Sequence, residues 1–297
     1  MQTHRYLKDH IQRRVQRELK QQGYAFVRRQ DHYVEKAQIA GLEKFRASYK
    51  DFPIDNHLND GEGHRIRTYG RFLFEPKTGT LRIFAHDTFF QSAKFDELYG
   101  DIHREFSPLL MRNLENLYFL NTLIDDFYNF PIEKEFRDEP FEISAHLIRI
   151  ASVPGNNIGR PAPEGIHQDG YHFGVARLFA RQNIIGAESR VHNLQKEIID
   201  RGYLLKPMDA LYMNDRAIFH SVEPFEAADP SQASCRDVLI SLYQPLSESP
   251  QKPARTFSLD RGGILAYLCN YSGFNSPQPS AANLAFATSK VVKPRLI

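Results

Sequence analysis

Short apolar runs separated by turn residues fill the second half of the chain, and they constrain its fold most. Residues 141–151 alternate and include β-branched side chains, which is typical of a β-strand. Four shorter runs of similar character follow, at 173–180, 210–213, 217–222 and 238–243. Several short strands punctuated by turns predict a sandwich or a barrel. We therefore expect a core that is mainly β.

The first half of the chain is predicted to add helices around this core. Residues 5–22 are rich in helix formers, and Gly23 is a suitable C-cap. The other expected elements are a strand at 24–27, a helix at about 34–49, a loop at 51–63, a strand at 64–74 with a hairpin partner at 81–84, and helical spacing at about 101–128. The predicted fold class is α+β, mainly β with flanking helices.

A change of composition after Pro245 predicts where the main domain ends. Beyond it the chain is rich in Ser, Pro, Gln and Lys, and its apolar runs are scattered. We predict one domain over residues 1–245, with a helical part at 1–60 and the β core at about 63–243. Residues 246–297 would form a C-terminal extension that wraps the core or is partly disordered.

Charge and hydropathy argue against several classes of protein. The net charge is +2, and no basic cluster is interleaved with aromatic residues, so we expect no nucleic-acid partner. The first 20 residues lack the apolar segment of a secretory signal, and no run approaches the roughly 18 apolar residues that cross a bilayer. Cys235 and Cys269 are too few for a disulfide framework or a cysteine-rich zinc site. We expect a cytoplasmic protein with no membrane partner, of unpredicted oligomeric state.

The pair His167 and Asp169 is the first candidate for a metal site. On an extended segment, residues two apart point to the same side, so the imidazole and the carboxylate can converge on one ion. By itself the pair is equally consistent with ordinary hydrogen bonding in a loop. His103 and Glu105 have the same spacing, but they lie in a stretch predicted to be helical, where residues two apart face different directions.

His220 and Arg236 turn this pair into an ordered set. His220 lies in the strand-like run 217–222, where a lone histidine would otherwise read as a core residue. Arg236 begins a later run, and a buried arginine there needs an anionic partner. The alternative for Arg236 is an ordinary salt bridge to Asp237 or Glu223.

Two imidazoles and one carboxylate leave three positions of an octahedral Fe(II) open. A 2-oxo acid could occupy two of these positions, and water and then dioxygen the third. Arg236 would hold the far carboxylate of 2-oxoglutarate through a bidentate fork, which Lys would do less well. Zn²⁺ would also accept two His and one Asp, but nothing obvious about a zinc site requires Arg236.

Four segments together resemble the bacterial Fe(II)/2-oxoglutarate-dependent dioxygenases that hydroxylate free amino acids, and the L-isoleucine hydroxylases most of all. The segments are Pro163-Glu-Gly-Ile-His-Gln-Asp-Gly170, Asn183-Ile-Ile-Gly-Ala-Glu-Ser189, Phe219-His-Ser-Val-Glu-Pro224 and Arg236-Asp-Val-Leu239. Further matches are Arg65, Arg67, Tyr69, Arg71, Phe90-Gln-Ser92, His146 and Arg149. The resemblance covers roughly residues 63–243.

The resemblance implies a double-stranded β-helix (a jelly-roll, cupin-like core) that uses Fe(II), 2-oxoglutarate and O2. It implies His167, Asp169 and His220 as catalytic metal ligands and Arg236 as the anchor of 2-oxoglutarate. The implied reaction is hydroxylation of a C–H bond of a free L-amino acid or a similar small polar metabolite, with succinate and CO2 as coproducts.

The residues after Asp169 depart from the family pattern. Relatives often carry an acid there, whereas this chain has Gly170, Tyr171 and His172. A substrate ammonium would then need another acceptor, and Glu188 is a candidate. His172 could be mistaken for a ligand, but it should point away from the pair.

Arginines are the candidates for a substrate carboxylate. Arg149 and Arg181 could grip it, although each is individually more typical of a structural ion pair or an exposed strand residue. Arg65 and Arg67 alternate on one strand face and could bind a ligand or serve the structure. Arg149, Arg67, Tyr171 and Glu188 together are the predicted substrate-binding residues.

Two other functions remain open at this point. The same chemistry could act on a protein side chain or a larger natural product, which the unassigned residues 246–297 and the altered residues after Asp169 would allow. A non-catalytic β-helix binding module is the third reading. Such a module would be expected to lose a metal ligand or the arginine, whereas this chain keeps all four. The sequence does not say which atom is oxidised, or whether sulfoxidation or desaturation replaces hydroxylation.

Overall fold

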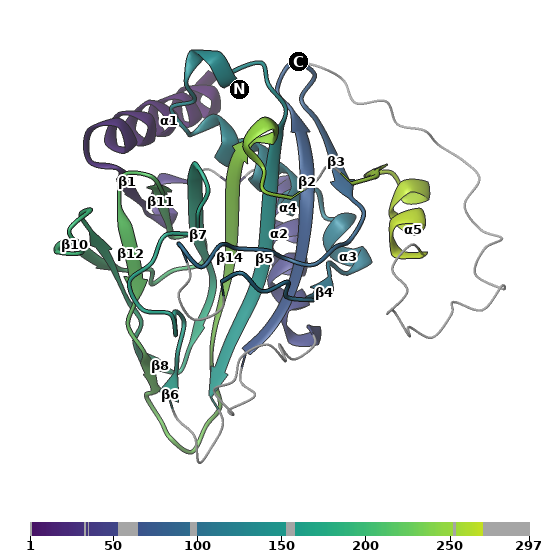
Figure 1. The fold of residues 1–297 in the computed structure, drawn as a ribbon. Helices are drawn as coiled ribbons and strands as arrows, with labels where there is room; N and C mark the ends of the chain where they lie inside the picture. Colours follow the sequence, from purple (N-terminus) through teal and green to yellow (C-terminus); the bar gives the residue numbers. More distant parts are fainter. Residues whose placement is uncertain are drawn as a thin grey trace, which may run out of the picture.

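A large, mostly antiparallel sheet forms the frame of the molecule (Figure 1). The computed structural model describes residues 2–32, 34, 36–52, 65–95, 100–152, 158–251 and 254–269, with side chains from Asp9 onward. The strands of the large sheet are β1 (Tyr24–Val27), β2 (Arg65–Glu75), β3 (Thr80–Phe84), β4 (Ser107–Pro108), β5 (Phe141–Ser152), β7 (Phe173–Gln182), β11 (Ala210–Asn214), β14 (Ser234–Pro245) and β15 (Thr256–Ser258). Their order is β1-β11-β7-β14-β5-β2-β3-β15, and β4 pairs in parallel with β2.

Two smaller antiparallel sheets complete the β structure of the described residues. One consists of β9 (Glu188–His192), β10 (Ile198–Tyr203) and β12 (Phe219–Val222), in the order β10-β9-β12. The other consists of β6 (Ile158–Gly159), β8 (Ile184–Gly186) and β13 (Phe225–Ala227), in the order β6-β13-β8. Val191 of β9 packs in one buried cluster with Leu211 and Met213 of β11, so the first small sheet faces the large one. This pair of facing sheets confirms the predicted double-stranded β-helix.

The helices pack on the other face of the large sheet. They are α1 (Gln2–Gln22), α2 (Lys36–Ser48), α3 (Met111–Leu114), α4 (Leu117–Tyr128) and α5 (Arg261–Cys269), with 3-10 turns at Arg29–Asp31, Tyr49–Asp51, Lys134–Phe136 and Leu246–Glu248. Phe45 of α2 and Phe119 of α4 stack at a ring separation of 5.0 Å, within the same core cluster as Ile143 and Leu147 of β5. Because strand side chains alternate, the even-numbered residues of β5 are left facing away from the helices.

The end of α1 follows from one glycine. Gly23 has a φ of +85°, and its N–H donates to the Leu19 carbonyl at 3.1 Å. A left-handed residue at this position is the usual way to close a helix, and a Cβ there would lie 2.8 Å from Ile218. The chain can therefore turn at once into β1, as predicted.

Two parts of the chain differ from the sequence prediction or extend it. The helix predicted from about residue 101 begins only at Met111, so the prediction for 101–110 was wrong. Arg104 pairs with Phe89 in a β-bridge, and Ser107–Pro108 pairs with β2. Pro108 also disfavours a helix that would run through it. Beyond Pro245, β15 pairs with β3 and is followed by α5. Most of the loop predicted at 51–63 lies outside the described residues.

Candidate active site

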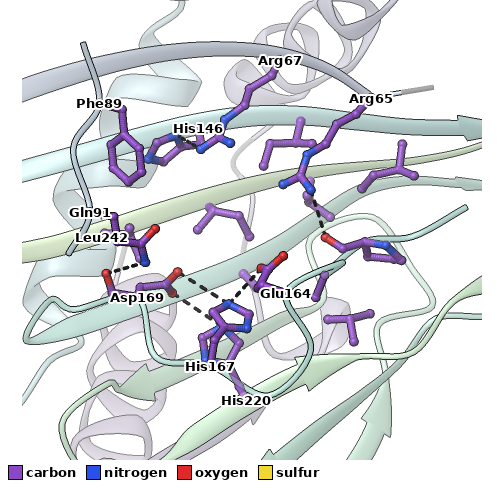
Figure 2. Close-up of a pocket in the computed structure, with 18 of the residues that line it drawn as sticks. Arg65, Arg67, Phe89, Gln91, His146, Glu164, His167, Asp169, His220 and Leu242 are labelled. Atoms are coloured by element: carbon purple, nitrogen blue, oxygen red, sulfur yellow. Dashed lines mark hydrogen bonds and ion pairs between the residues drawn. The ribbon is translucent and has the colours of Figure 1, made fainter. Parts of the chain in front are cut away.

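A pocket lies between the large sheet and the sheet β10-β9-β12, on the face opposite the helices (Figure 2). Side chains from β2, β5 and β14 line one wall, and the segment 161–169 with β12 lines the other. Among the lining residues are Arg65, Arg67, Phe89, Gln91, Arg104, Phe106, His146, Ile148, Ile150, Glu164, His167, Asp169, His220, Arg236 and Val238. Four arginines and two acids therefore share one cavity.

His167, Asp169 and His220 come together in this pocket. One nitrogen or oxygen from each lies within 4.8 Å of those of the other two. The distance from Asp169 Oδ1 to His167 Nε2 is 3.9 Å, and from Asp169 Oδ2 to His220 Nε2 it is 3.6 Å. The backbones of His167 and His220 exchange two hydrogen bonds of 3.0 Å, which brings their rings to 4.2 Å. Two imidazoles and a carboxylate in this arrangement form a donor set suited to Fe(II).

The hydrogen bond of His167 and the lowered pKa of His220 also fit a metal. His167 Nδ1 lies 2.9 Å from the Gly165 carbonyl, so Nδ1 donates to that carbonyl and Nε2 is the ring nitrogen that could serve as a metal ligand. Burial lowers the pKa of His167, but the carboxylates of Glu164 and Asp169 outweigh this and raise it. Burial and the neighbouring His167 hold the pKa of His220 well below its usual range. The buried Nδ1 of His220 has no hydrogen-bond partner among the residues that the structure describes.

Arg236 lies on the opposite wall of the same pocket. Its side chain is 3% exposed, and within the described part of the chain no carboxylate pairs with it. Burial, together with Arg181 and Arg65, lowers the pKa of Arg236 to about 10. A buried and unpaired guanidinium is costly unless an anion joins it.

The salt bridge considered for Arg236 from the sequence does not form. Asp237 faces the other side of β14, because strand neighbours alternate, and it pairs with Arg149 at 2.6 Å. Glu223 pairs with Arg190 at 2.5 Å. Both of the acids proposed as partners are therefore engaged elsewhere, and Arg236 is left facing the pocket.

A third part of the pocket combines arginines with aromatic rings. The Arg67 guanidinium lies 3.8 Å from the centre of the Phe106 ring and 2.6 Å from His146 Nδ1. Burial and the nearby arginines, Arg67 first, hold the pKa of His146 well below its usual range, so its neutral Nδ1 accepts from Arg67. Arg104 donates to Gln91 Oε1 at 3.0 Å. These contacts hold two guanidiniums in fixed positions on the wall.

Several residues singled out from the sequence lie elsewhere. Arg149 faces the helices and pairs with Asp237 through two bonds of 2.6 and 2.7 Å. Tyr171 is buried, and burial and Glu142 raise its pKa, but it does not line the pocket. Glu188 binds Arg190 at 2.9 Å on β9, outside the lining. None of these three side chains is therefore positioned to contact a ligand in the pocket.

Three other candidates also lie outside the lining of the pocket. His172 contacts Glu248 at 2.9 Å, away from the three candidate ligands. Arg181 donates to the Gly186 carbonyl at 2.8 Å. His103 is exposed and lies 2.9 Å from Thr88 Oγ1. The prediction that His103 lies in a helix was wrong, since its neighbour Arg104 forms a β-bridge with Phe89.

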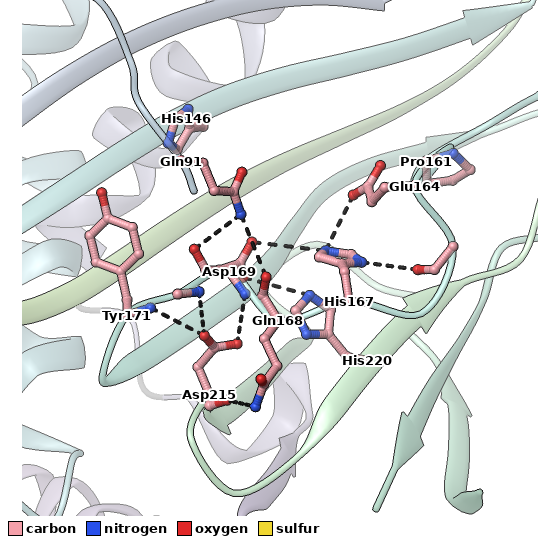
Figure 3. Close-up of polar contacts among 12 residues, drawn as sticks. Gln91, His146, Pro161, Glu164, His167, Gln168, Asp169, Tyr171, Asp215 and His220 are labelled. Atoms are coloured by element: carbon pink, nitrogen blue, oxygen red, sulfur yellow. Dashed lines mark hydrogen bonds and ion pairs between the residues drawn. The ribbon is translucent and has the colours of Figure 1, made fainter. Parts of the chain in front are cut away.

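Sequence reasoning gave no role to three residues that shape the site. Gln91 Nε2 donates to the Asp169 carbonyl at 3.1 Å, and Glu164 Oε1 lies 3.2 Å from His167 Nε2. Both stand in segments that carried the family resemblance. Asp215 accepts the backbone N–H of Asp169 at 2.9 Å (Figure 3). No local pattern marks Asp215, because its partners lie more than 40 residues away.

A double-stranded β-helix with two histidines and an aspartate between its sheets is the architecture of the 2-oxoglutarate-dependent oxygenases. The family model for 2OG-Fe dioxygenases matches residues 46–241, which is more than half of the chain. The chain therefore belongs to the 2OG-Fe dioxygenase family and is an enzyme that uses Fe(II), 2-oxoglutarate and O2. The predicted enzyme class and cofactors are confirmed. The closer resemblance to isoleucine hydroxylases stays a prediction.

Solved structures share the fold. A bsmA homologue from Methylobium petroleophilum is 25% identical, with a TM-score of 0.70 over 82% of this chain and 96% of that one. IDO from Bacillus thuringiensis is 19% identical, with a TM-score of 0.67 over 79% and 99% of the two chains. The Fe(II)/α-ketoglutarate-dependent dioxygenase TqaL is 15% identical, with a TM-score of 0.63 over 86% and 98%. No curated protein matches the sequence. Among the described residues, no helix is both long and apolar enough to cross a membrane.

Proposed function

We propose that this enzyme hydroxylates a C–H bond of a free L-amino acid or a similar small polar metabolite, and that His167, Asp169 and His220 hold its iron. The observation that carries the co-substrate part of the proposal is Arg236, which is buried across the pocket from these three side chains and has no acid paired with it among the described residues. When bound, Fe(II) would supply the redox chemistry that couples oxidation of the substrate by O2 to conversion of 2-oxoglutarate into succinate and CO2, with one atom of O2 entering succinate and the other the substrate.

The protein's own groups have separate tasks in this proposal. The two imidazoles and the Asp169 carboxylate would hold the ion, and a donor set of this kind leaves room for exchangeable ligands. Arg236 offers a two-pronged donor to the far carboxylate of 2-oxoglutarate, which supplies the anion that the buried guanidinium lacks. Ile148, Ile150 and Val238 line the same wall and make it apolar.

The charges around the rest of the pocket support a zwitterionic substrate. Arg67 and Arg104 present guanidiniums that could receive a substrate carboxylate. Glu164, 18% exposed beside His167, is an acid that could receive an ammonium group in place of the acid missing after Asp169. An α-amino acid needs one acceptor and one donor of this kind.

The test is a panel of the free L-amino acids with Fe(II), 2-oxoglutarate and ascorbate. We expect at least one of them to raise succinate release above the rate without substrate and to yield a product heavier by one oxygen atom. Asp169→Ala and His220→Ala should abolish both signals. If no amino acid raises succinate release in a wild-type protein that binds metal and 2-oxoglutarate, the amino-acid substrate is refuted. If the alanine variants remain active, the metal site is assigned wrongly.

A further inference from the structure

We propose that Asp215 is a positioning residue. It is the centre of a hydrogen-bond network that holds Asp169 and His220 in the arrangement needed to bind the metal. This inference rests on the proposed role of those two side chains as ligands. Asp215 lies in the turn between β11, which ends at Asn214, and β12, which carries His220. Its side chain is 2% exposed and does not line the pocket, so it would act through other residues.

The Asp215 carboxylate is the point around which the loop of Asp169 turns (Figure 3). Oδ1 accepts the N–H of Asp169 at 2.9 Å, and Oδ2 accepts those of Gly170 at 2.7 Å and Tyr171 at 3.2 Å. Three consecutive N–H groups can converge on one anion only where the backbone curls into a concave nest. Gly170 makes this curl possible with a φ of +85°, and a Cβ there would lie 2.6 Å from the Phe95 ring. The carboxylate thereby fixes the direction in which the Asp169 side chain leaves the loop.

Further hydrogen bonds between the loop of Asp169 and the turn of Asp215 complete this network. Gln168 Nε2 donates to the carbonyl of Asp215 at 2.5 Å and to that of Ile218 at 3.1 Å. The N–H of Asp215 donates to the His172 carbonyl at 3.1 Å. The loop that carries Asp169 and the turn that leads to His220 are therefore joined by hydrogen bonds from both sides. A shift of this turn would separate two of the three metal ligands.

Asp209 provides a matched control for a purely structural role. It is also buried, and it also accepts three backbone N–H groups, from Arg29 at 2.7 Å, Leu205 at 2.9 Å and Lys206 at 3.0 Å. Asp209 does not line the pocket. If Asp215 served only stability, replacing either aspartate by Asn should have the same consequences. In both, an amide N–H2 would face backbone donors where a carboxylate oxygen had accepted them.

The experiment compares the full-length wild type with Asp215→Asn, Asp209→Asn and His220→Ala, using Co(II) alone as the probe. Calorimetric titration gives the Kd for Co(II), the visible bands of bound Co(II) report its coordination, and thermal unfolding gives the Tm. We expect both Asn variants to lower the Tm. Only Asp215→Asn should weaken Co(II) binding, by about 10- to 100-fold, as is usual when groups that orient metal ligands are lost. Its Co(II) bands should change as well.

The outcomes separate this inference from the proposed function. Wild-type Co(II) affinity in a folded Asp215→Asn, or an equal loss of affinity in Asp209→Asn, would overturn the positioning role. If Asp215→Asn does not fold, Gln168→Met decides, because it removes two bonds between the same loop and turn. Weaker Co(II) binding in Gln168→Met supports the positioning role of the network, and unchanged binding refutes it. If His220→Ala binds Co(II) as well as the wild type, the metal site itself is refuted.

Discussion

Replacing Arg236 by methionine should stabilise the protein without 2-oxoglutarate and weaken its binding of 2-oxoglutarate. Methionine keeps much of the length of the side chain but removes the charge. The arginine is 3% exposed and lies beside Arg65 and Arg181, with no acid paired to it among the described residues. The two effects have opposite signs because only the co-substrate supplies the missing anion.

The gain in stability can be worked out from the burial of the charge. Desolvation and the two neighbouring guanidiniums lower the pKa of Arg236 to about 10. At about 1.4 kcal/mol per pKa unit, the charged side chain is destabilised by about 3 kcal/mol relative to an arginine in water. Replacement of buried ionic groups by apolar side chains stabilises proteins by about 1–4 kcal/mol. For a chain of this size, each kcal/mol raises the Tm by about 2–4 °C.

The loss of affinity follows from the contacts that Arg236 would make. Removing one member of a buried, charged hydrogen-bonded pair costs about 2–5 kcal/mol of binding free energy. This corresponds to a Kd for 2-oxoglutarate that is about 30- to 5,000-fold higher. Saturating 2-oxoglutarate should therefore raise the Tm of the wild type and leave the Tm of Arg236→Met nearly unchanged.

The assay is scanning calorimetry of the Co(II)-loaded proteins, with and without 2-oxoglutarate, together with calorimetric titration of 2-oxoglutarate. Arg149→Met is the control, because Arg149 pairs with Asp237 on the other face of the sheet. It should lower the Tm by leaving a buried carboxylate unpaired, and it should not change the Kd for 2-oxoglutarate. An Arg236→Met variant with a lower Tm in the absence of 2-oxoglutarate and an unchanged Kd would refute the reasoning.

Three further predictions concern other charged groups. Glu164→Gln should raise the KM for the amino-acid substrate by about 10- to 150-fold through loss of a charged hydrogen bond, with an unchanged Kd for 2-oxoglutarate; an unchanged KM in steady-state kinetics argues against this role. Because the folded-state pKa of His146 lies well below its usual value, the unfolded chain takes up a proton that the native state does not. Urea unfolding should therefore show that the free energy of unfolding falls by about 1.4 kcal/mol more in the wild type than in His146→Asn between about pH 7.5 and 5.5. Parallel plots of this free energy against pH would contradict the prediction. Asp126→Asn should lower the free energy of unfolding by about 3–5 kcal/mol in the same assay, because it leaves the buried Arg177 without its carboxylate partner. A loss below about 1 kcal/mol would show that the pair contributes little to stability.

Local patterns in the sequence were enough to locate most strands. The alternation in residues 141–151 depends only on the two faces of a strand, and β5 occupies residues 141–152. The same holds for β2, β7 and β14. The pattern failed at residues 101–110, where apolar spacing suggested a helix. There the backbone pairs with Phe89 and β2, and such long-range pairing leaves no periodic trace in the segment itself.

Alternation along a strand says that two faces differ, but not which face meets the pocket. Arg149 and His146 stand on the same strand, and only the packing of the helices shows that Arg149 faces away from the pocket. The same rule excludes Asp237 as a partner of Arg236, since adjacent strand residues point to opposite sides. The sequence alone had left that salt bridge open.

The sequence by itself was enough to pick out His167, Asp169, His220 and Arg236 as candidates, because residue type and order along the chain indicate a donor set and a cation suited to an anionic co-substrate. Only the tertiary structure decided how these residues meet. The convergence of the three candidate ligands, the absence of an acid paired with Arg236 among the described residues and the hydrogen bonds around Asp215 all depend on contacts between distant segments. Such contacts arise when the sheets pack together, so no stretch of sequence encodes them alone.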